Sequence, residues 1–405
     1  MAIDVRVTIL LTLKGRDLCT LRWLWHANRV GLPFSVFIAD GEVNPTIARL
    51  IEDPAVFPNL LIEYHRYNDR TFYDFYRKLE DALSKIKTPY VMMSDNDDFL
   101  FPSGIVRSLD YLECSPDYVS AGGGIGHFET RVEENQLLSL QGKVERLWYQ
   151  QSKAYQSYNL DCPLAAERVC EVYSGFLTVC YNVFRVETLR QIANETAQFN
   201  FQRLDNAELF LMLRAATLGK INSDSSYISY FRQLGTSSNP SRGKDFVYSL
   251  SAEPYVEEIQ GIVKRIAVIA AQADGVEADG VAERLNAISA ARLREKLIAV
   301  LGWRATVKGV LKKSIPQVLL TYAKTLSERV RSGKSSATGG RPISREGFFQ
   351  LAARAGASTA LLAKLQRELA DVERTMENED FLAFVQVCAP ELLRQDKRAP
   401  SGADV

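Results

Sequence analysis

Short apolar runs alternate with segments of helical periodicity through the first hundred residues. Val5–Leu13 is continuously apolar and rich in β-branched residues, which is typical of a strand buried on both faces of a parallel sheet. The alternation indicates a β-α-β-α-β-α-β order with right-handed crossovers. The predicted strands are 5–13, 34–39, 60–67 and 90–93, and the predicted helices are 18–30, 45–51 and 71–85.

Polar residues follow each of these strands at the point where it ends. Gly15, Asp40, Asn68 and Asp95 occupy these positions. Ligands of parallel α/β sheets bind beyond the carboxyl ends of the strands. The pattern therefore predicts that these groups converge on one edge of the sheet.

The chain beyond Pro102 mixes strands and helices and then becomes almost wholly helical. Helices are expected at 104–112, 186–194 and 207–218, and strands at 118–128, 176–184 and 227–231, whereas 130–170 has no assignable pattern. The glycine-rich run at 122–126 lacks the Gly-Lys-Ser/Thr ending of a phosphate loop, so it predicts close backbone approach instead. The expected division is an α/β domain at 1–250, a helical region at 251–331, a linker at 332–343, a small helical bundle at 344–395 and a disordered tail at 396–405.

Charge is balanced overall but not locally. The formal net charge is zero, so no global field favours nucleic acid as a partner. Between Trp303 and Arg345, however, ten Lys or Arg residues face one acid. Such a stretch fits a solvated helix face whose apolar side packs on the α/β domain, and the alternative is an anionic membrane surface. No leader pattern or membrane-spanning run is evident, and the six scattered cysteines favour a reducing compartment. We therefore expect a cytoplasmic protein, with the inner face of the cell membrane as a second location.

The strongest chemical signal is Asp95-Asn96-Asp97-Asp98, which directly follows the fourth predicted strand. Carboxylates two residues apart can bind one hard cation such as Mg²⁺ or Mn²⁺. Asp95, Asp97 and Asp98 are therefore the candidate metal ligands. A solvated turn is the alternative, because Asp and Asn favour turns.

Residues 5 to about 235 resemble the GT-A glycosyltransferases, and among them glycosyltransferase family 2 of the bacterial surface polysaccharide type. The metal motif matches in spacing and position, and Phe37-Ile38-Ala39-Asp40-Gly41 resembles the second-strand motif, with Ala39 where an acid often stands. The resemblance implies a nucleotide-diphosphate sugar donor, with Mn²⁺ or Mg²⁺ as cofactor. The candidate donor-binding residues are Lys14, Arg16, Asp40, Asn68, Arg70, Asp95 and Arg232.

The resemblance also implies a general base at the start of a later helix. Asp205 is the first choice and Glu208 the second, because Leu204 replaces the leading acid of the family's pattern. A helix N-cap with a capping box is the alternative reading of Asp205. Arg232 would contact the diphosphate, or else lie on the surface.

The implied activity is metal-dependent transfer of a sugar to a hydroxyl of a glycan or lipid-linked glycan acceptor, by single-displacement inversion, in polysaccharide biosynthesis. An aspartyl phosphoryl transferase would carry its Asp-x-Asp after the first strand, and a calcium loop would need more oxygen ligands. A catalytically inactive, transferase-like scaffold of a polysaccharide assembly complex stays open as the non-enzymatic alternative.

Overall fold

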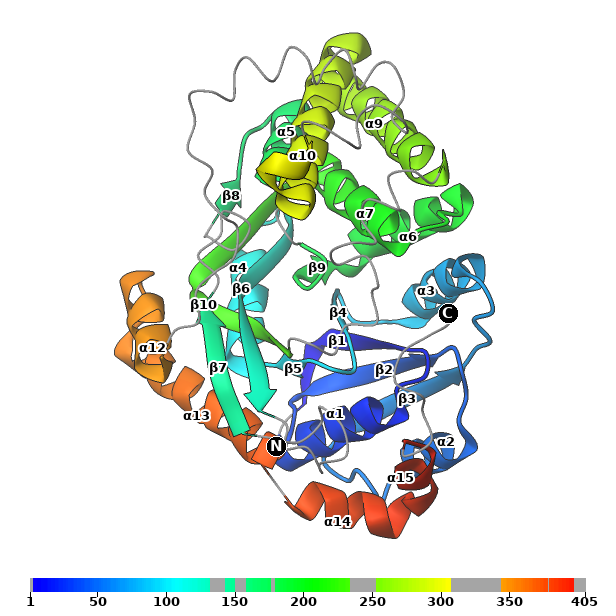
Figure 1. Cartoon of the computed structure of the whole chain (residues 1–405), viewed down its shortest axis with the longest axis vertical. Coiled ribbons are helices and arrows are strands. Elements are labelled where there is room, and N and C mark those ends of the chain that lie inside the picture. The colour runs from blue at the N-terminus through cyan, green and yellow to red at the C-terminus, as the bar shows by residue number, and fades with distance from the viewer. Residues whose placement is uncertain are drawn as a thin grey trace.

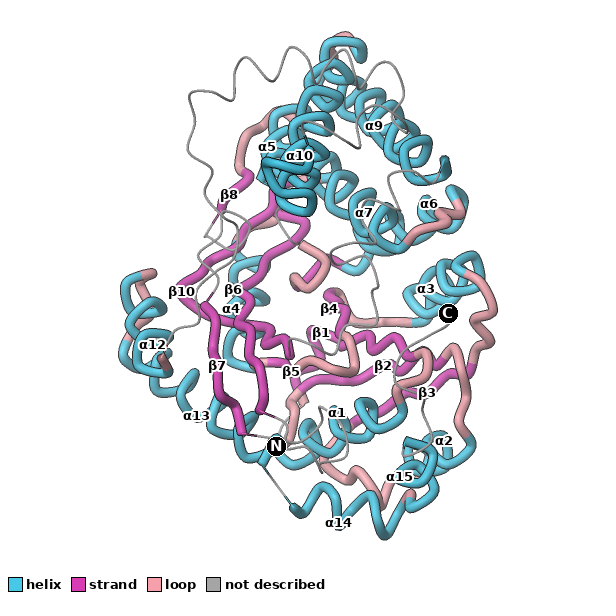
Figure 2. The backbone as a smooth tube through the Cα atoms, viewed as in Figure 1, coloured by secondary structure: helices cyan, strands magenta, loops and turns pink. Residues whose placement is uncertain are grey.

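The computed structural model describes residues 3–131, 143–149, 158–175, 179–233, 253–306, 344–377 and 379–396. Its strands form one ten-stranded sheet in the order β3-β2-β1-β4-β9-β6-β10-β5, with β7 beside β6 and β8 beside β10. Helices lie on both sides of this sheet (Figure 1 and Figure 2). The predicted α/β fold, with helices flanking the sheet and a helical region after it, is confirmed.

The first half of the sheet is parallel, and its inner strands β2, β1 and β4 bury both faces, whereas the edge strand β3 is at most partly buried. Along β1, Val7, Ile9 and Leu11 enter a core shared with α1 and α2, whereas Leu10 enters a core shared with α3. This alternation explains the continuously apolar sequence of the strand. The elements are β1 (Asp4–Leu13), α1 (Asp17–Val30), β2 (Phe34–Asp40), α2 (Pro45–Glu52), β3 (Leu61–Arg66), α3 (Phe72–Lys85) and β4 (Tyr90–Ser94).

The second half of the sheet mixes directions. Strands β6 and β10 pair in parallel, and β9 joins β6 to β4 in antiparallel orientation. A Cβ atom at Gly122 would lie 2.0 Å from the Asn182 Oδ1 atom, so close approach requires glycine there. The elements are β5 (Phe99–Leu100), α4 (Pro102–Cys114), β6 (Tyr118–Arg131), β7 (Lys143–Tyr149), β8 (Tyr158–Leu160), α5 (Ala165–Gly175), β9 (Val183–Arg185), α6 (Val186–Phe199), α7 (Leu204–Leu218) and β10 (Lys220–Gln233).

The C-terminal helices pack against the α/β part in two places (Figure 1). One pair, α9 and α10, extends the core around α5 and α7 through residues such as Ile262 and Leu285. The later helices line the other side, where Leu369 and Met376 of α13 meet Phe99 and Phe231. Phe381 of α14 and Leu392 of α15 join the core around α1 and α2. The elements are α9 (Glu253–Asp274), α10 (Ala278–Thr306), α12 (Arg345–Arg354), α13 (Thr359–Glu377), α14 (Glu379–Cys388) and α15 (Pro390–Asp396).

Several predicted bounds differ from those observed. The strand expected at 176–184 is observed only at its end: 176–178 lie outside the described residues, and 179–182 form a turn in which the Asn182 N–H donates to the Val179 carbonyl at 3.0 Å. Strand β9 begins only at Val183. The unassigned region 130–170 contains β7, β8 and the start of α5. The strand expected at 227–231 begins already at Lys220.

The linker at 332–343, the tail beyond Asp396 and most of the basic stretch lie outside the described residues. The division into domains stays a prediction, as does membrane association. Among the described helices, none combines the length and hydropathy that crossing a bilayer requires. All six cysteines carry free thiols.

Candidate active site

The acids after β4 form one cluster at the carboxyl end of the parallel strands. Single carboxylate oxygens of Asp95, Asp97 and Asp98 all lie within 4.8 Å of one another. Buried Asn96 anchors the loop between them, because its Nδ2 atom donates to the Thr20 Oγ1 atom at 2.9 Å. Three carboxylates this close repel one another, and a divalent cation would relieve the repulsion. The donor set therefore fits a hard divalent metal ion.

Two arginines of the segment that follows β1 contact Asp97, one at its side chain and one at its backbone carbonyl. The Arg16 Nη2 atom lies 2.8 Å from the Asp97 Oδ2 atom. Fully buried Arg22 donates from Nη2 to the Asp97 carbonyl at 3.0 Å and from Nη1 to the Gln233 Oε1 atom at 2.8 Å. The strand-loop-helix segment thus fixes both the side chain and the backbone of Asp97.

Asp98 is the most deeply buried acid of the cluster and is bonded at both oxygens. Its Oδ1 atom accepts from the Gln233 N–H at 3.1 Å, and its Oδ2 atom accepts from the Tyr230 hydroxyl and from the Arg232 Nε atom at 3.3 Å. Burial raises the pKa of Asp98 to about 7, against the lowering charge of Arg232. Through these contacts Asp98 attaches the loop that follows β4 to β10.

Asp95 is the open member of the cluster. Its side chain keeps 45% of its surface exposed, although protein surrounds the carboxyl closely enough that burial raises its pKa. The Tyr181 hydroxyl donates to the Asp95 Oδ2 atom at 2.7 Å, and the Arg232 Nη2 atom approaches it at 3.5 Å. Arg232 lies 4.6 Å above the Tyr181 ring, which stacks on Tyr230 at 4.3 Å. One arginine on two stacked rings therefore faces two of the three acids, and the alternative of a surface arginine does not hold.

The two candidate bases on α7 have different surroundings. Asp205 accepts from the Arg203 Nε atom at 3.1 Å. Glu208 has no hydrogen-bond partner within the described part of the chain and keeps an exposed surface. Protein atoms nevertheless surround the carboxyl group of Glu208. This desolvation and the charge of Asp95 raise the pKa of Glu208 to about 7, against the opposing charge of Arg232. The negative charge of Asp95 therefore acts on the Glu208 carboxyl. The alternative in which Asp205 caps α7 does not hold, because Arg203 is the cap residue and no side-chain cap bond forms.

At the β2 end of the same edge, Asp40 is buried and already bonded. It accepts from the Glu42 N–H at 3.1 Å and from the Tyr64 hydroxyl at 2.7 Å. Nearby Asp17 has a raised pKa because of burial, with the charges of Asp40 and Glu42 acting in the same direction. Lys14 is exposed at the end of β1. This part of the edge therefore gathers acids that can accept hydrogen bonds from a ligand.

The last predicted donor-side residues lie after β3. Asn68 and Arg70 are both exposed, and the Arg70 guanidinium donates to the Asn68 amide oxygen at 3.1 and 3.2 Å once that amide is oriented to satisfy both groups. Between them, buried Asp69 pairs with buried Lys78. A Cβ atom at Gly41 would lie 2.1 Å from the Asp69 Oδ2 atom, so glycine is required where β2 leaves the sheet.

Four residues that touch the acids were not among the sequence-derived candidates. They are Arg22, Tyr181, Tyr230 and Gln233, whose contacts are given above. A cation on the apolar face of the helix at 18–30 is a signal that could have identified Arg22. Nothing in the local sequence distinguishes Tyr181 from the other tyrosines.

No protein-family model and no curated protein matches this chain. Solved structures do. Residues 1–349 of TarS from S. aureus align with a TM-score of 0.45 and 12% identity, over 92% of this chain and 89% of that chain, and TarS is also solved with UDP and with UDP-GlcNAc. The mannosyltransferase PcManGT from Pyrobaculum calidifontis, in complex with GDP-Man and Mn²⁺, aligns with a TM-score of 0.37 and 13% identity, over 93% of this chain and 89% of that chain. At this identity and TM-score the similarity establishes no family.

Proposed function

We propose that this chain is a metal-dependent glycosyltransferase that moves a sugar from a nucleotide-diphosphate donor to a hydroxyl of a glycan or lipid-linked glycan acceptor. One observation supports this above the others. Three carboxylates converge within 4.8 Å where β4 ends, and Glu208 lies within electrostatic reach of Asp95. A metal-binding group together with a carboxylate that can accept a proton is the arrangement that transfer from a diphosphate leaving group requires.

Asp97 and Asp95 are the proposed metal ligands, because both oxygens of Asp98 already accept hydrogen bonds from β10. When bound, the cation would neutralise charge on the departing diphosphate. Mn²⁺ and Mg²⁺ both suit carboxylate ligands. We propose that Asp98 supports the loop instead of binding the ion.

The donor would lie along the edge between β2 and β4. Asp40 would accept a hydrogen bond from the base or ribose, since an ionised carboxylate retains acceptor sites beyond its two present bonds. Lys14, Arg16, Asn68 and Arg70 supply cationic and amide groups at the exits of β1 and β3. Arg232, already facing Asp95 and Asp98, would hold negative charge on the donor once the acids are engaged.

We assign the general base to Glu208 over Asp205. As the acceptor oxygen forms its bond to the anomeric carbon, Glu208 takes the hydroxyl proton, the bond from that carbon to the phosphate oxygen breaks, and its electron pair leaves with the nucleotide diphosphate. This single displacement inverts the anomeric centre. A pKa near 7 suits a general base at neutral pH. Asp205 is paired with Arg203 and would position the start of α7.

The test is a thermal-unfolding screen of the full chain against UDP, GDP, UDP-GlcNAc and GDP-Man, each with and without Mn²⁺. A specific ligand at about 100 times its Kd stabilises a protein by about 2.7 kcal/mol. We expect at least one nucleotide to raise the Tm only when Mn²⁺ is present, and Asp97→Ala to lose that rise. Metal-dependent binding without turnover of any sugar nucleotide would favour the inactive scaffold, and equal shifts in Asp97→Ala would overturn the metal site. Membrane association and a role in polysaccharide biosynthesis stay predictions.

A further inference from the structure

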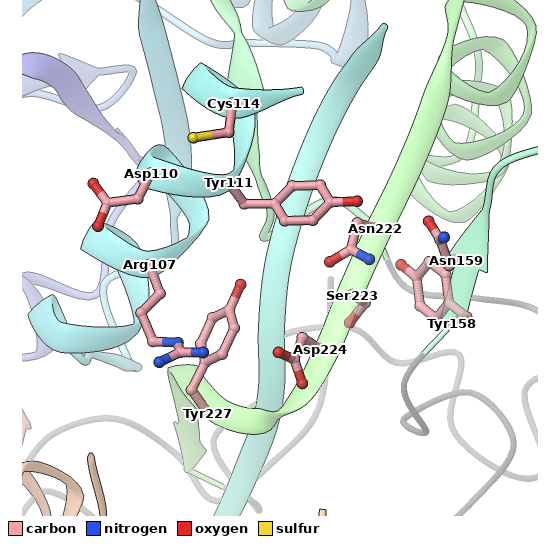
Figure 3. A pocket seen from close by; sticks show the side chains of 10 residues that line it. All are labelled: Arg107, Asp110, Tyr111, Cys114, Tyr158, Asn159, Asn222, Ser223, Asp224 and Tyr227. Atoms are coloured by element: carbon pink, nitrogen blue, oxygen red, sulfur yellow. The ribbon is translucent and has the colours of Figure 1, made fainter. Parts of the chain in front are cut away.

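A second recess lies away from the acid cluster, between α4, β8 and β10 (Figure 3). Its volume is about 670 Å³, within the size range of small-molecule sites. Asp224, in its wall, precedes Arg232 by eight residues on β10, which places the two groups up to roughly 26 Å apart along an extended strand. We call this recess the α4 hollow.

One wall of the α4 hollow presents an arginine with free donors. Arg107 is exposed on α4, and its guanidinium lies 5.1 Å from the centre of the Tyr227 ring. Within the described residues it makes no hydrogen bond or ion pair. Stacking holds the planar guanidinium in place while its N–H groups remain available in the plane. Tyr111, one turn further along α4, is directed toward Asn222 on the opposite wall (Figure 3).

The opposite wall presents acceptors and an amide. Asn222 is half-buried on β10, and its side chain has no partner in the part of the chain that the structure describes. Asp224 accepts the Ser226 N–H at 2.8 Å through one oxygen and retains the other. Donors and acceptors therefore face one space from two elements, with tyrosine rings between them.

The charges of these walls favour a neutral ligand. Asp110, at the rim, is paired with Arg6 at 3.0 Å, which leaves Arg107 and Asp224 as opposite charges in the same recess. A phosphate group in this recess would be attracted by Arg107 but repelled by the carboxylate of Asp224. Hydroxyl groups both donate and accept, and the faces of sugar rings pack on aromatic side chains, so a neutral sugar matches all of these groups.

A neighbouring recess of about 470 Å³ lies between α4 and α13. Arg107 and Asp110 line both, and Ser103 and Lys364 belong to the second. Two recesses that share Arg107 and Asp110 offer room for successive rings. We propose that the α4 hollow and this neighbouring recess hold a segment of a neutral glycan chain, at a binding site separate from the one where transfer occurs.

The experiment is saturation-transfer NMR on the full chain with three neutral oligosaccharides, maltohexaose, cellohexaose and chitohexaose. We expect at least one to bind, with Asn222→Ala and Arg107→Ala each weakening it at least tenfold. Arg77→Ala, which removes another exposed arginine on α3, serves as the matched control and should bind as the wild type does. Thermal unfolding checks that each variant folds.

Asp97→Ala separates this site from the proposed transfer site, because it should retain oligosaccharide binding. Binding lost in Asp97→Ala but kept in Asn222→Ala would place the sugar at the acid cluster and overturn the proposal. Binding only of an anionic probe, oligogalacturonate, or of none of the three neutral probes, would also overturn it. None of these outcomes depends on whether the chain transfers a sugar.

Discussion

The Arg16 Nη2 atom lies 2.8 Å from the Asp97 Oδ2 atom, so the carboxylate that we propose as a metal ligand is paired with a guanidinium. Arg16 itself adopts a left-handed conformation, with φ of 59°. The turn at Gly15 and Arg16, which follows β1, therefore places the Arg16 guanidinium next to the acids that follow β4. We propose that the same arginine offsets the charge of Asp97 and also contacts the donor.

Asp97→Ala should abolish both sugar transfer and metal-dependent nucleotide binding while leaving the fold intact. Loss of a metal ligand removes several kcal/mol of charge stabilisation, so we expect a rate at least about 10³-fold lower. Nucleotide affinity measured by calorimetry, with and without Mn²⁺, checks this. Transfer at the wild-type rate would show that the metal assignment is wrong.

Arg16→Gly should strengthen binding of Mn²⁺ alone and weaken binding of the nucleotide diphosphate. A partly exposed ion pair is worth at most about 1 kcal/mol, so the gain in metal affinity should be roughly fivefold. Arg16→Ala is the matched variant. It removes the same charge but keeps a Cβ atom in the left-handed region, which costs about 1 kcal/mol that glycine avoids. Equal metal affinity in all three proteins would contradict competition between Arg16 and the ion.

Glu208→Gln should lower kcat by about 10²- to 10⁴-fold with donor affinity nearly unchanged. Because the pKa of Glu208 is raised to about 7, the carboxyl is protonated below that pH and cannot accept a proton. Wild-type transfer should therefore rise as the pH increases through about 7. Asp205→Asn should keep this profile. If Asp205→Asn removes activity and Glu208→Gln does not, the base is Asp205.

The sequence predicted the first four strands and the acid motif because their signals are local. Val5–Leu13 is apolar throughout, and Asp95 to Asp98 follow a buried strand directly. The partners of those acids come from distant segments. Arg22 meets Gln233 across 211 positions, and Tyr181 meets Asp95 across 86. Such contacts depend on the arrangement of the whole sheet, which periodicity does not encode.

The same limit applies to the choice of base and to the C-terminal helices. Asp205 and Glu208 are three residues apart on α7, so the sequence does not distinguish their surroundings. The structure shows that Asp205 pairs with Arg203, whereas Glu208 is exposed to the charge of Asp95. Helical periodicity predicted the helices of 344–395, but not that Glu368 accepts from the Ser103 N–H at 2.8 Å at the start of α4.

Thr375→Val tests whether α13 is part of the cooperative fold around the acids. Thr375 is buried, and its Oγ1 atom donates to the Asp371 carbonyl at 2.9 Å, so it accepts from the Arg29 Nη2 atom and from the His26 Nδ1–H, each at 2.7 Å. Valine keeps the shape but leaves the buried His26 Nδ1–H unpaired, whereas the Arg29 Nη2 atom retains the Asp371 carbonyl at 2.7 Å. The free energy of unfolding should therefore fall by about 1–3 kcal/mol. Thr359→Val, at the exposed start of the same helix, is the matched control and should change stability by less than about 0.5 kcal/mol. Denaturant unfolding followed by tryptophan fluorescence and by circular dichroism measures both variants. If the two probes report a single, destabilised transition in Thr375→Val, α13 unfolds together with the α/β core. If the main transition is unchanged, α13 unfolds independently of that core.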